Sequence, residues 1–252
     1  MKSPLKDVLE YCAAPALKRI IPEDSVVDSY MLYAGTLELP LARSGRKIIA
    51  HTTKYPVYEF WKIAKEEPLA VSAAVKEFYP KIDSQLFYFL QQSWAEMGDP
   101  LARAAFFFLL NRCSAAGCAS SGKIDKEEFS VPALNYLRNF KGENFYPQWD
   151  AVEDPVETLE QATEGNYFII PAGRFNYNLF DYGKNRGHDM TLLNHQRLYE
   201  KMKSIDKKGA VVYKNSSKVE ELYSSFNLRF VDERGRFTDK RKDAKEIIIV
   251  NF

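Results

Sequence analysis

Tyr167-Phe168-Ile169-Ile170 is the stretch that decides the fold, because a short apolar run of aromatic and β-branched residues is typical of a buried strand. After a long polar and aromatic loop, strands and helices alternate to the end of the chain. The sequence predicts helices over Leu192 to Ser204 and Ser217 to Ser224, and strands over Gly209 to Tyr213, Phe226 to Val231 and Glu246 to Phe252. This order predicts an open α/β sheet.

The first fifty residues repeat this pattern on a smaller scale. Val26-Val27 opens one short apolar run, Lys47 to Ala50 is another, and a helical stretch from Leu37 to Arg43 lies between them. From Val57 to Phe78 and from Ser84 to Leu110 the apolar residues recur at helical spacing instead. We therefore predict an α/β domain from residues 1–55 and 161–252, and an inserted helical subdomain over 56–160 with a loop or irregular hairpin near 112–132.

Charge and composition exclude several classes of protein. The 35 basic and 34 acidic residues give a net charge of +1, so no overall field attracts nucleic acid or an anionic membrane. The most apolar window, Ala104 to Leu110, is far shorter than the roughly 20 residues of a membrane span. The three cysteines, Cys12, Cys113 and Cys118, lack the second pair of a zinc site. We expect a protein of the cytoplasm, of a cell or of a virus-infected host, with no membrane partner.

Several strings, in the right order and at the right intervals, resemble the Dam-type family of DNA adenine N6-methyltransferases across nearly the whole chain. The matching strings are Glu66-Glu67-Pro68, Phe107 to Arg112, Gly117, Gly122, Phe129-Ser130-Val131-Pro132, Asn194 to Leu198, Gly209 to Asn215 and Glu246 to Phe252. The resemblance implies a Rossmann-like methyltransferase sheet with an inserted helical subdomain of the recognition type. It also implies that the region from Arg112 to Pro132 corresponds to the hairpin with which the family contacts DNA.

The family's catalytic tetrapeptide "DPPY", which holds a flipped adenine, aligns with Pro171-Ala172-Gly173-Arg174. Both the carboxylate and the stacking tyrosine are missing there. This degenerate motif predicts that the chain has no catalytic residues for methyl transfer.

The motifs that bind S-adenosylmethionine in the family are also lost. Its "PGGK" aligns with Cys12 to Pro15, and its glycine-rich loop aligns with Asp28 to Ala34, where bulky side chains replace glycines that allow close backbone approach. The acidic residue that holds the ribose falls near His51-Thr52, where the sequence has no carboxylate. We expect no cofactor, no cofactor-binding residues and no bound metal, and we expect that the chain is not an enzyme.

The residues that remain as candidates are cations and amides that could contact nucleic acid. They are Asn111, Arg112, Lys123 and Lys126 in the matched hairpin, Arg174 after the strand at Tyr167, and Arg234, Arg236, Lys240 and Arg241 near the C-terminus. A solvated loop and a solvated hairpin remain alternative interpretations for the last two groups. Ala115-Ala116 replaces the family's "FN" and Ser120 its arginine, so sequence-specific contacts are not expected.

Three functions stay open. The first is an inactive methyltransferase-like protein that binds DNA or another nucleic acid, or that joins an active methyltransferase paralogue or a larger assembly. The second is an enzyme of altered chemistry, with Arg174, Asp181, His188 and Asp189 in a new site. The third is an active S-adenosylmethionine-dependent DNA adenine methyltransferase with divergent motifs.

Overall fold

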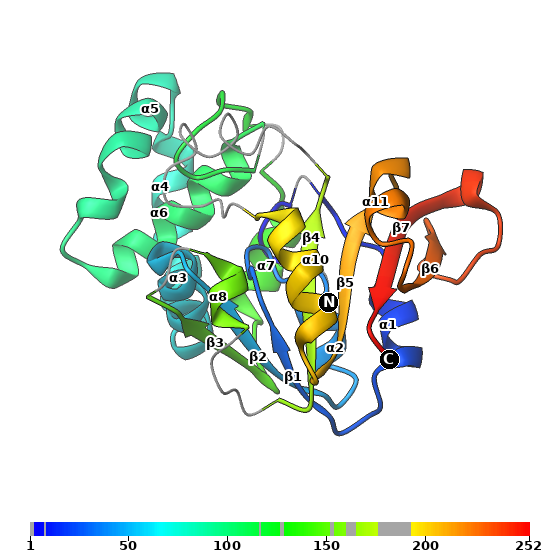
Figure 1. Cartoon of the computed structure of the whole chain (residues 1–252). Coiled ribbons are helices and arrows are strands. Elements are labelled where there is room, and N and C mark those ends of the chain that lie inside the picture. The colour runs from blue at the N-terminus through cyan, green and yellow to red at the C-terminus, as the bar shows by residue number, and fades with distance from the viewer. Residues whose placement is uncertain are drawn as a thin grey trace.

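The structure, a computed structural model, describes residues 3–7, 9–115, 117–126, 129–151, 154–159, 165–175 and 193–252. Within these residues seven strands form one sheet, in the order β3-β2-β1-β4-β5-β7-β6 (Figure 1). The strands are β1 Val26–Ser29, β2 Lys47–Thr52, β3 Phe145–Trp149, β4 Tyr167–Gly173, β5 Lys208–Lys214, β6 Asn227–Asp232 and β7 Ala244–Val250. Strands β3, β2, β1, β4 and β5 pair in parallel, and β7 runs antiparallel to both β5 and β6.

This order confirms the expected fold class, a Rossmann-like sheet of the methyltransferase type. Tyr167 to Ile170 pairs directly with Lys208 to Val211, so the apolar run that decides the fold lies in the middle of the sheet. Its neighbour on the other side is β1. Both faces of a central parallel strand are covered, which explains why the run is continuously apolar rather than alternating.

Helices cover both faces of the sheet (Figure 1). One apolar core lies between the sheet and α1, α2 and α3 to α7, and the other lies under α8, α10 and α11. The helices are α1 Ala14–Ile20, α2 Glu38–Ala42, α3 Tyr55–Glu66, α4 Pro68–Phe78, α5 Ser84–Ser93, α6 Pro100–Cys113, α7 Val131–Arg138, α8 Pro155–Thr158, α10 His195–Ser204 and α11 Ser217–Leu222. Short 3-10 turns occupy Tyr79–Lys81, Trp94–Glu96 and Arg241–Asp243.

The helical region between β2 and β3 is organised around α6. Nine of the fourteen residues of α6 are buried, and Asp99 caps its first turn by accepting a hydrogen bond from the backbone of Leu101. A helix that is apolar on most sides must be enclosed, and α3, α4 and α5 all pack against it. The buried residues of α3 to α7 therefore form a single apolar core with the residues on that face of the sheet.

Two details differ from the sequence-based expectation. Strand β3 falls inside 56–160, the range assigned to the insert, yet it pairs with β2 and belongs to the sheet. In the predicted hairpin near 112–132, the described residues contain one antiparallel bridge, between Ser114 and Ile124, and Val131 begins α7. Pro132 favours this helix start because its missing N–H is not needed in a first turn.

In the described parts of the chain, every helix is too short or too polar to cross a bilayer.

We expect Phe107→Ala to lower the free energy of unfolding by about 3–5 kcal/mol, because the cavity it leaves is enclosed. The Phe107 ring is fully buried and packs 5.2 Å from the ring of Phe60 and 5.4 Å from that of Trp94, between centroids. Phe89→Ala on α5 is the control, because that ring is 61% exposed and its loss should change little. Urea unfolding measures both, and equal effects would contradict the assignment of α6 as the core helix.

Candidate functional site

The carboxyl end of β4 is where the sequence places the degenerate catalytic motif. Pro171 and Gly173 pair with Val212 and Tyr213 of β5 through a bulge, so most of the motif is part of the strand rather than a loop after it. Gly173 has φ of 72°, and a Cβ placed on it would lie 2.9 Å from Leu9 Cδ1. This strand end is therefore packed against the N-terminal segment, and only Arg174 of the four residues is exposed.

The loop after β1 corresponds to the glycine-rich cofactor loop of the sequence comparison. Its backbone stays hydrogen-bonded to the sheet, since Tyr30 N donates to Ile169 O at 2.9 Å and Leu32 N donates to His51 O at 2.8 Å. The side chains of Tyr30 and Leu32 are buried on opposite faces, one in each core. Met31 between them adopts φ of 64°, a conformation that ordinarily favours glycine.

The N-terminal segment covers the continuation of this loop. Ser3 Oγ donates to Ala34 O, and Thr36 Oγ1 donates to Asp7 Oδ2 at 3.3 Å. Burial raises the pKa of Asp7, and burial also raises the pKa of Glu38, whose carboxylate accepts a hydrogen bond of 2.7 Å from Ser29 Oγ. The carboxyl groups of Asp7 and Glu38 near this loop therefore accept hydrogen bonds from the protein itself.

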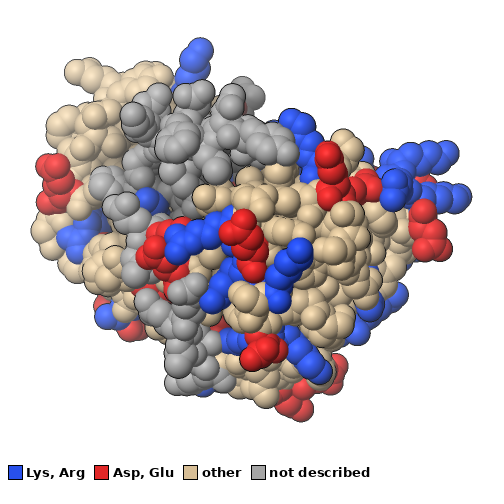
Figure 2. Space-filling model, viewed as in Figure 1, with Lys and Arg blue, Asp and Glu red and all other residues tan. Residues whose placement is uncertain are grey.

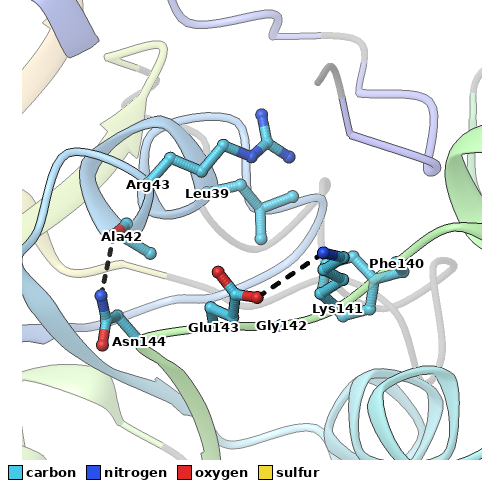
Figure 3. Close-up of a pocket in the computed structure, with 8 residues that line it drawn as sticks. All are labelled: Leu39, Ala42, Arg43, Phe140, Lys141, Gly142, Glu143 and Asn144. Carbon is cyan, nitrogen blue, oxygen red and sulfur yellow. Dashed lines mark hydrogen bonds and ion pairs between the residues drawn. The ribbon is translucent and has the colours of Figure 1, made fainter.

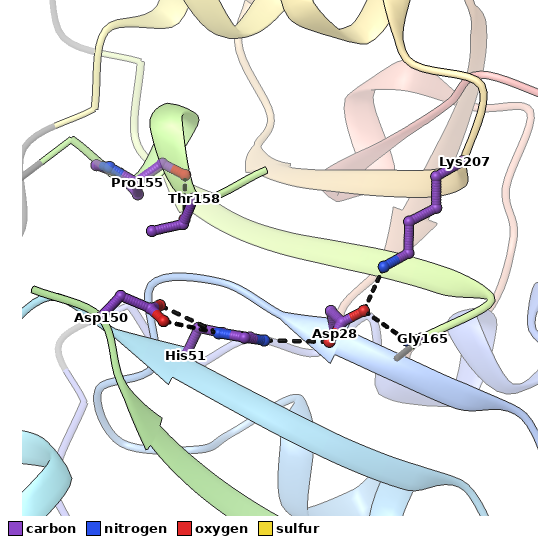
Figure 4. A network of polar contacts seen from close by, with 7 residues as sticks. All are labelled: Asp28, His51, Asp150, Pro155, Thr158, Gly165 and Lys207. Atoms are coloured by element: carbon purple, nitrogen blue, oxygen red, sulfur yellow. Dashed lines mark hydrogen bonds and ion pairs between the residues drawn. The ribbon is translucent and has the colours of Figure 1, made fainter. Parts of the chain in front are cut away.

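A buried polar network lies on the face of the sheet that α8 covers (Figure 4). His51, from β2, places Nε2 3.1 Å from Asp28 Oδ1 and Nδ1 3.1 Å from Asp150 Oδ2. Asp28, in β1, also accepts hydrogen bonds from the ammonium of Lys207 and from Gly165 N. The network thus connects β1, β2 and the end of β3 to the residues just before β4 and β5.

Sequence analysis missed this network, although it placed the ribose-binding position of the methyltransferases near His51. A carboxylate does approach that position, but it is Asp150, from the end of β3, and it is committed to His51. Asp28 and Asp150 lie 23 and 99 residues from His51 in the chain. The one available signal was that each of the three lies in or just after a parallel strand, where neighbouring strands bring such residues together.

Burial of the His51 ring lowers its pKa, but hydrogen bonds to Asp150 and Asp28 and their negative charges outweigh this effect. The pKa is therefore raised above its ordinary value of 6.5. The Tyr30 ring stacks on the imidazole at 4.7 Å between centroids and holds it in place. When His51 is protonated, the carboxylates of Asp28 and Asp150 face the two cations His51 and Lys207, and the buried charges are balanced.

A second histidine, His195, lies at the start of α10 beside the carboxyl end of β5. Its Nδ1 is 2.8 Å from the hydroxyl of Tyr213, and the ring of Phe175 stacks on it at 4.6 Å between centroids. Burial lowers the pKa of His195 to about 4, so the imidazole is neutral at physiological pH. Asp181, His188 and Asp189, the other members of the alternative site with Arg174, lie outside the described residues.

The predicted hairpin residues divide into buried and exposed members. Asn111 is fully buried, and its amide donates to Lys6 O, Gly117 O and the Tyr33 hydroxyl. The prediction of a surface contact through Asn111 was therefore wrong in this conformation, because the tight turn at Gly117 uses the same amide. Arg112 is half-buried and donates to Ser130 Oγ at 3.0 Å.

Lys123 and Lys126 are exposed at the end of the hairpin. Lys126 Nζ lies 5.9 Å from the centre of the Tyr79 ring, and that ring stacks on Phe129 at 3.8 Å. The tip of the hairpin is held to α5, where Gln91 Nε2 donates to Gly122 O at 3.3 Å. These contacts place Lys126 beside an aromatic pair that the sequence did not reveal.

The C-terminal cations lie on the loop between β6 and β7, at the β6 edge of the sheet (Figure 1). Arg236 pairs with Asp232 at 3.2 Å, and Arg241 pairs with Glu220 at 3.0 Å. Arg234 and Lys240 are exposed. Basic and acidic side chains are interspersed on the face shown in Figure 2, so this loop is not a uniform basic patch.

A cavity of about 310 Å³ lies at the opposite edge of the sheet, beside the residues that precede β3 (Figure 3). Its two sides are α2 with Arg43 and the segment from Phe140 to Asn144, in which Lys141 Nζ lies 4.0 Å from Glu143 Oε1. None of the predicted site residues lines it. Ligands of open α/β sheets bind outside the carboxyl ends of the strands. This cavity lies beside the amino end of β3 instead, so it is not where a ligand is expected.

Comparison with known proteins adds little to this geometry. No protein-family model matches the chain, and no curated protein matches it. Among solved structures, the chain is similar to TehB from Haemophilus influenzae, with a TM-score of 0.36 and 8% identity. The alignment covers 94% of this chain and 60% of the TehB chain. At this level of similarity no activity can be carried over.

The pH dependence of stability should report the ionisation of His51. A raised pKa stabilises the folded protein below the ordinary value, and this contribution is lost as the pH rises through the folded pKa. The difference in unfolding free energy between the wild type and His51→Gln should therefore shrink as the pH rises above about 6.5, the ordinary pKa of histidine. His195→Gln is the control, because the neutral His195 should give a constant difference over this range. A difference for His51→Gln that grows with pH would contradict the network.

Proposed function

We propose that this protein is a catalytically inactive relative of the Dam-type methyltransferases that binds nucleic acid or serves as an assembly subunit. The observation that carries the proposal is the end of β4, where Pro171 to Gly173 belongs to the strand and packs against Leu9. A methyltransferase needs at this point a side chain that hydrogen-bonds the amino group of a flipped adenine and a ring that stacks on it. Pro171 and Ala172 supply neither.

Backbone groups do not replace the missing side chains at this strand end. Pro171 and Gly173 both pair with β5, and a bulge lies between them. Arg174, in the place of the stacking tyrosine, is a cation and would repel the positive charge that a methyl donor carries. Catalysis depends on preorganised groups at the reacting atoms, and these residues provide no such group.

The residues also do not fit S-adenosylmethionine. Tyr30, Met31 and Leu32 fill the turn in which the nucleoside would need to approach the backbone closely. The carboxylate beside the end of β2, that of Asp150, is buried and lies against His51 rather than open to a ligand. We therefore derive no step that uses this cofactor.

Nucleic-acid binding is the role that the remaining exposed cations support. Lys123 and Lys126 project from a hairpin that is fixed to α5 and flanked by Tyr79. Phosphate contacts need only placed cations, whereas base recognition needs paired donors and acceptors. Ala115 at the start of the hairpin offers no side-chain donor or acceptor, so we infer contact with the phosphate backbone alone.

We expect no binding of S-adenosylmethionine to the purified protein. In calorimetric titration with the cofactor at about 1 mM, the upper end of typical KM values, the heat should equal the heat of dilution. The physical reason is that Met31 and its neighbours occupy the required space. A dissociation constant in the micromolar range would instead support an active methyltransferase with divergent motifs.

We expect duplex DNA to bind modestly and with strong dependence on salt, since few cations are clustered in a nearly neutral chain. Lys123→Gln with Lys126→Gln should weaken binding about equally on unrelated sequences, as measured by fluorescence anisotropy at about 50 mM salt. Lys18→Gln with Lys208→Gln removes the same charge from exposed positions elsewhere and should have a smaller effect. If no duplex binds at low salt, an assembly role becomes the better account.

A further inference from the structure

The outer edge of β3 is closed to the addition of another strand. Ile48 N donates to Asn144 O and Asp150 N donates to Thr52 O, so the backbone groups of Phe145, Pro147 and Trp149 face away from β2. Phe145 O accepts a hydrogen bond of 2.7 Å from Lys65 Nζ, and Pro147 has no N–H to donate. A proline and a covered carbonyl protect an edge strand from pairing, so any partner here must contact side chains.

Three aromatic side chains are exposed at this edge, and Tyr146 and Trp149 lie on opposite faces of β3 because successive side chains of a strand alternate. Tyr55, Tyr146 and Trp149 are each 44–46% exposed, although large aromatic rings are usually covered. The rings of Tyr55 and Trp149 meet edge to face, with 5.3 Å between centroids. The Tyr55 hydroxyl lies 3.2 Å from Glu59, which in turn is held by Arg103. Tyr55 is therefore fixed in position before any partner binds.

Lysines accompany these rings, and the neighbouring acids are turned inward. Lys65 Nζ lies 4.2 Å and Lys47 Nζ 5.5 Å from the centre of the Tyr146 ring. Asp150, next to Trp149, is buried against His51, and Glu59 is buried against Arg103. Lys47 and Lys65 thus lie beside the Tyr146 ring, while the carboxylates of Asp150 and Glu59 are bound within the protein.

We propose that this aromatic edge, made of Tyr55, Tyr146, Trp149, Lys47 and Lys65, binds single-stranded nucleic acid. Unpaired bases stack on exposed rings, and the two lysines beside Tyr146 neutralise phosphates of the same strand. In a duplex the bases are already stacked on each other and do not offer their faces, so this surface should prefer single strands. It is separate from the hairpin with Lys123 and Lys126, so binding at one surface can be disproved without disproving binding at the other.

Trp149 provides a direct readout of stacking. The chain has three tryptophans, and Trp61 and Trp94 are almost completely buried. Titration of the whole protein with an oligothymidylate of about 12 nucleotides, a length within the range of known single-strand sites, should therefore quench the tryptophan fluorescence through Trp149. Trp149→Phe should abolish the quenching while a labelled oligonucleotide still binds, because the ring for stacking remains.

Removal of the rings should then remove the binding. Tyr55→Ala with Trp149→Ala should raise the dissociation constant for the labelled oligonucleotide about tenfold or more. The matched control is Tyr88→Ala with Phe89→Ala, an aromatic pair on α5 that is 46% and 61% exposed and lies outside this edge. Its binding should equal that of the wild type. Lys123→Gln with Lys126→Gln should leave the quenching in place.

Three results would overturn the proposal. The first is an unchanged fluorescence together with no binding of the labelled oligonucleotide at low salt. The second is a binding affinity that falls equally for the α5 control and for Tyr55→Ala with Trp149→Ala. The third is self-association through the aromatic edge, seen as a particle mass that rises with concentration for the wild type but not for Trp149→Ala.

Discussion

The pairing of buried charges across the sheet is the constraint on which the rest of this structure depends. Asp28 is fully buried, and an unpaired carboxylate in such a place would cost several kcal/mol, on the order of 3–5 when one partner of a buried pair is removed. His51, Lys207 and Gly165 N all supply partners to it. Because these groups come from β2 and from the residues just before β5 and β4, the network fixes the central strands relative to one another. Asp150 extends the same connection to the edge strand β3.

The same network binds side chains that, under the proposed function, an active methyltransferase would leave free for ligands. Asp150 lies beside the end of β2 but serves His51, and Tyr30 stacks on that imidazole rather than leaving space after β1. At the end of β4, with which the resemblance aligns the catalytic motif, the chain pairs with β5 and Gly173 lies close to the side chain of Leu9. Under the proposed function, these contacts lie at the positions where an active methyltransferase would bind substrate and cofactor.

Much of the fold could be predicted from the sequence, because apolar runs such as Tyr167 to Ile170 and the helical spacing around Phe107 depend on local pattern alone. β3 escaped prediction since its exposed side chains and Pro147 give an edge strand no continuous apolar run. The polar network escaped because its members meet only after the strands pair. Asn111 was misjudged for a related reason: its burial depends on Lys6, Tyr33 and Gly117, and the local sequence carries no trace of these contacts.

The measurement that tests the central claim most directly is methyl transfer itself. Purified protein would be incubated with radiolabelled S-adenosylmethionine and a mixture of duplex and single-stranded DNA that contains all short sequence contexts of adenine. We predict that label in the recovered DNA equals that left by heat-denatured protein, because no residue at the end of β4 can hold the amino group. Label that accumulates with time and is recovered as N6-methyladenine would contradict the account.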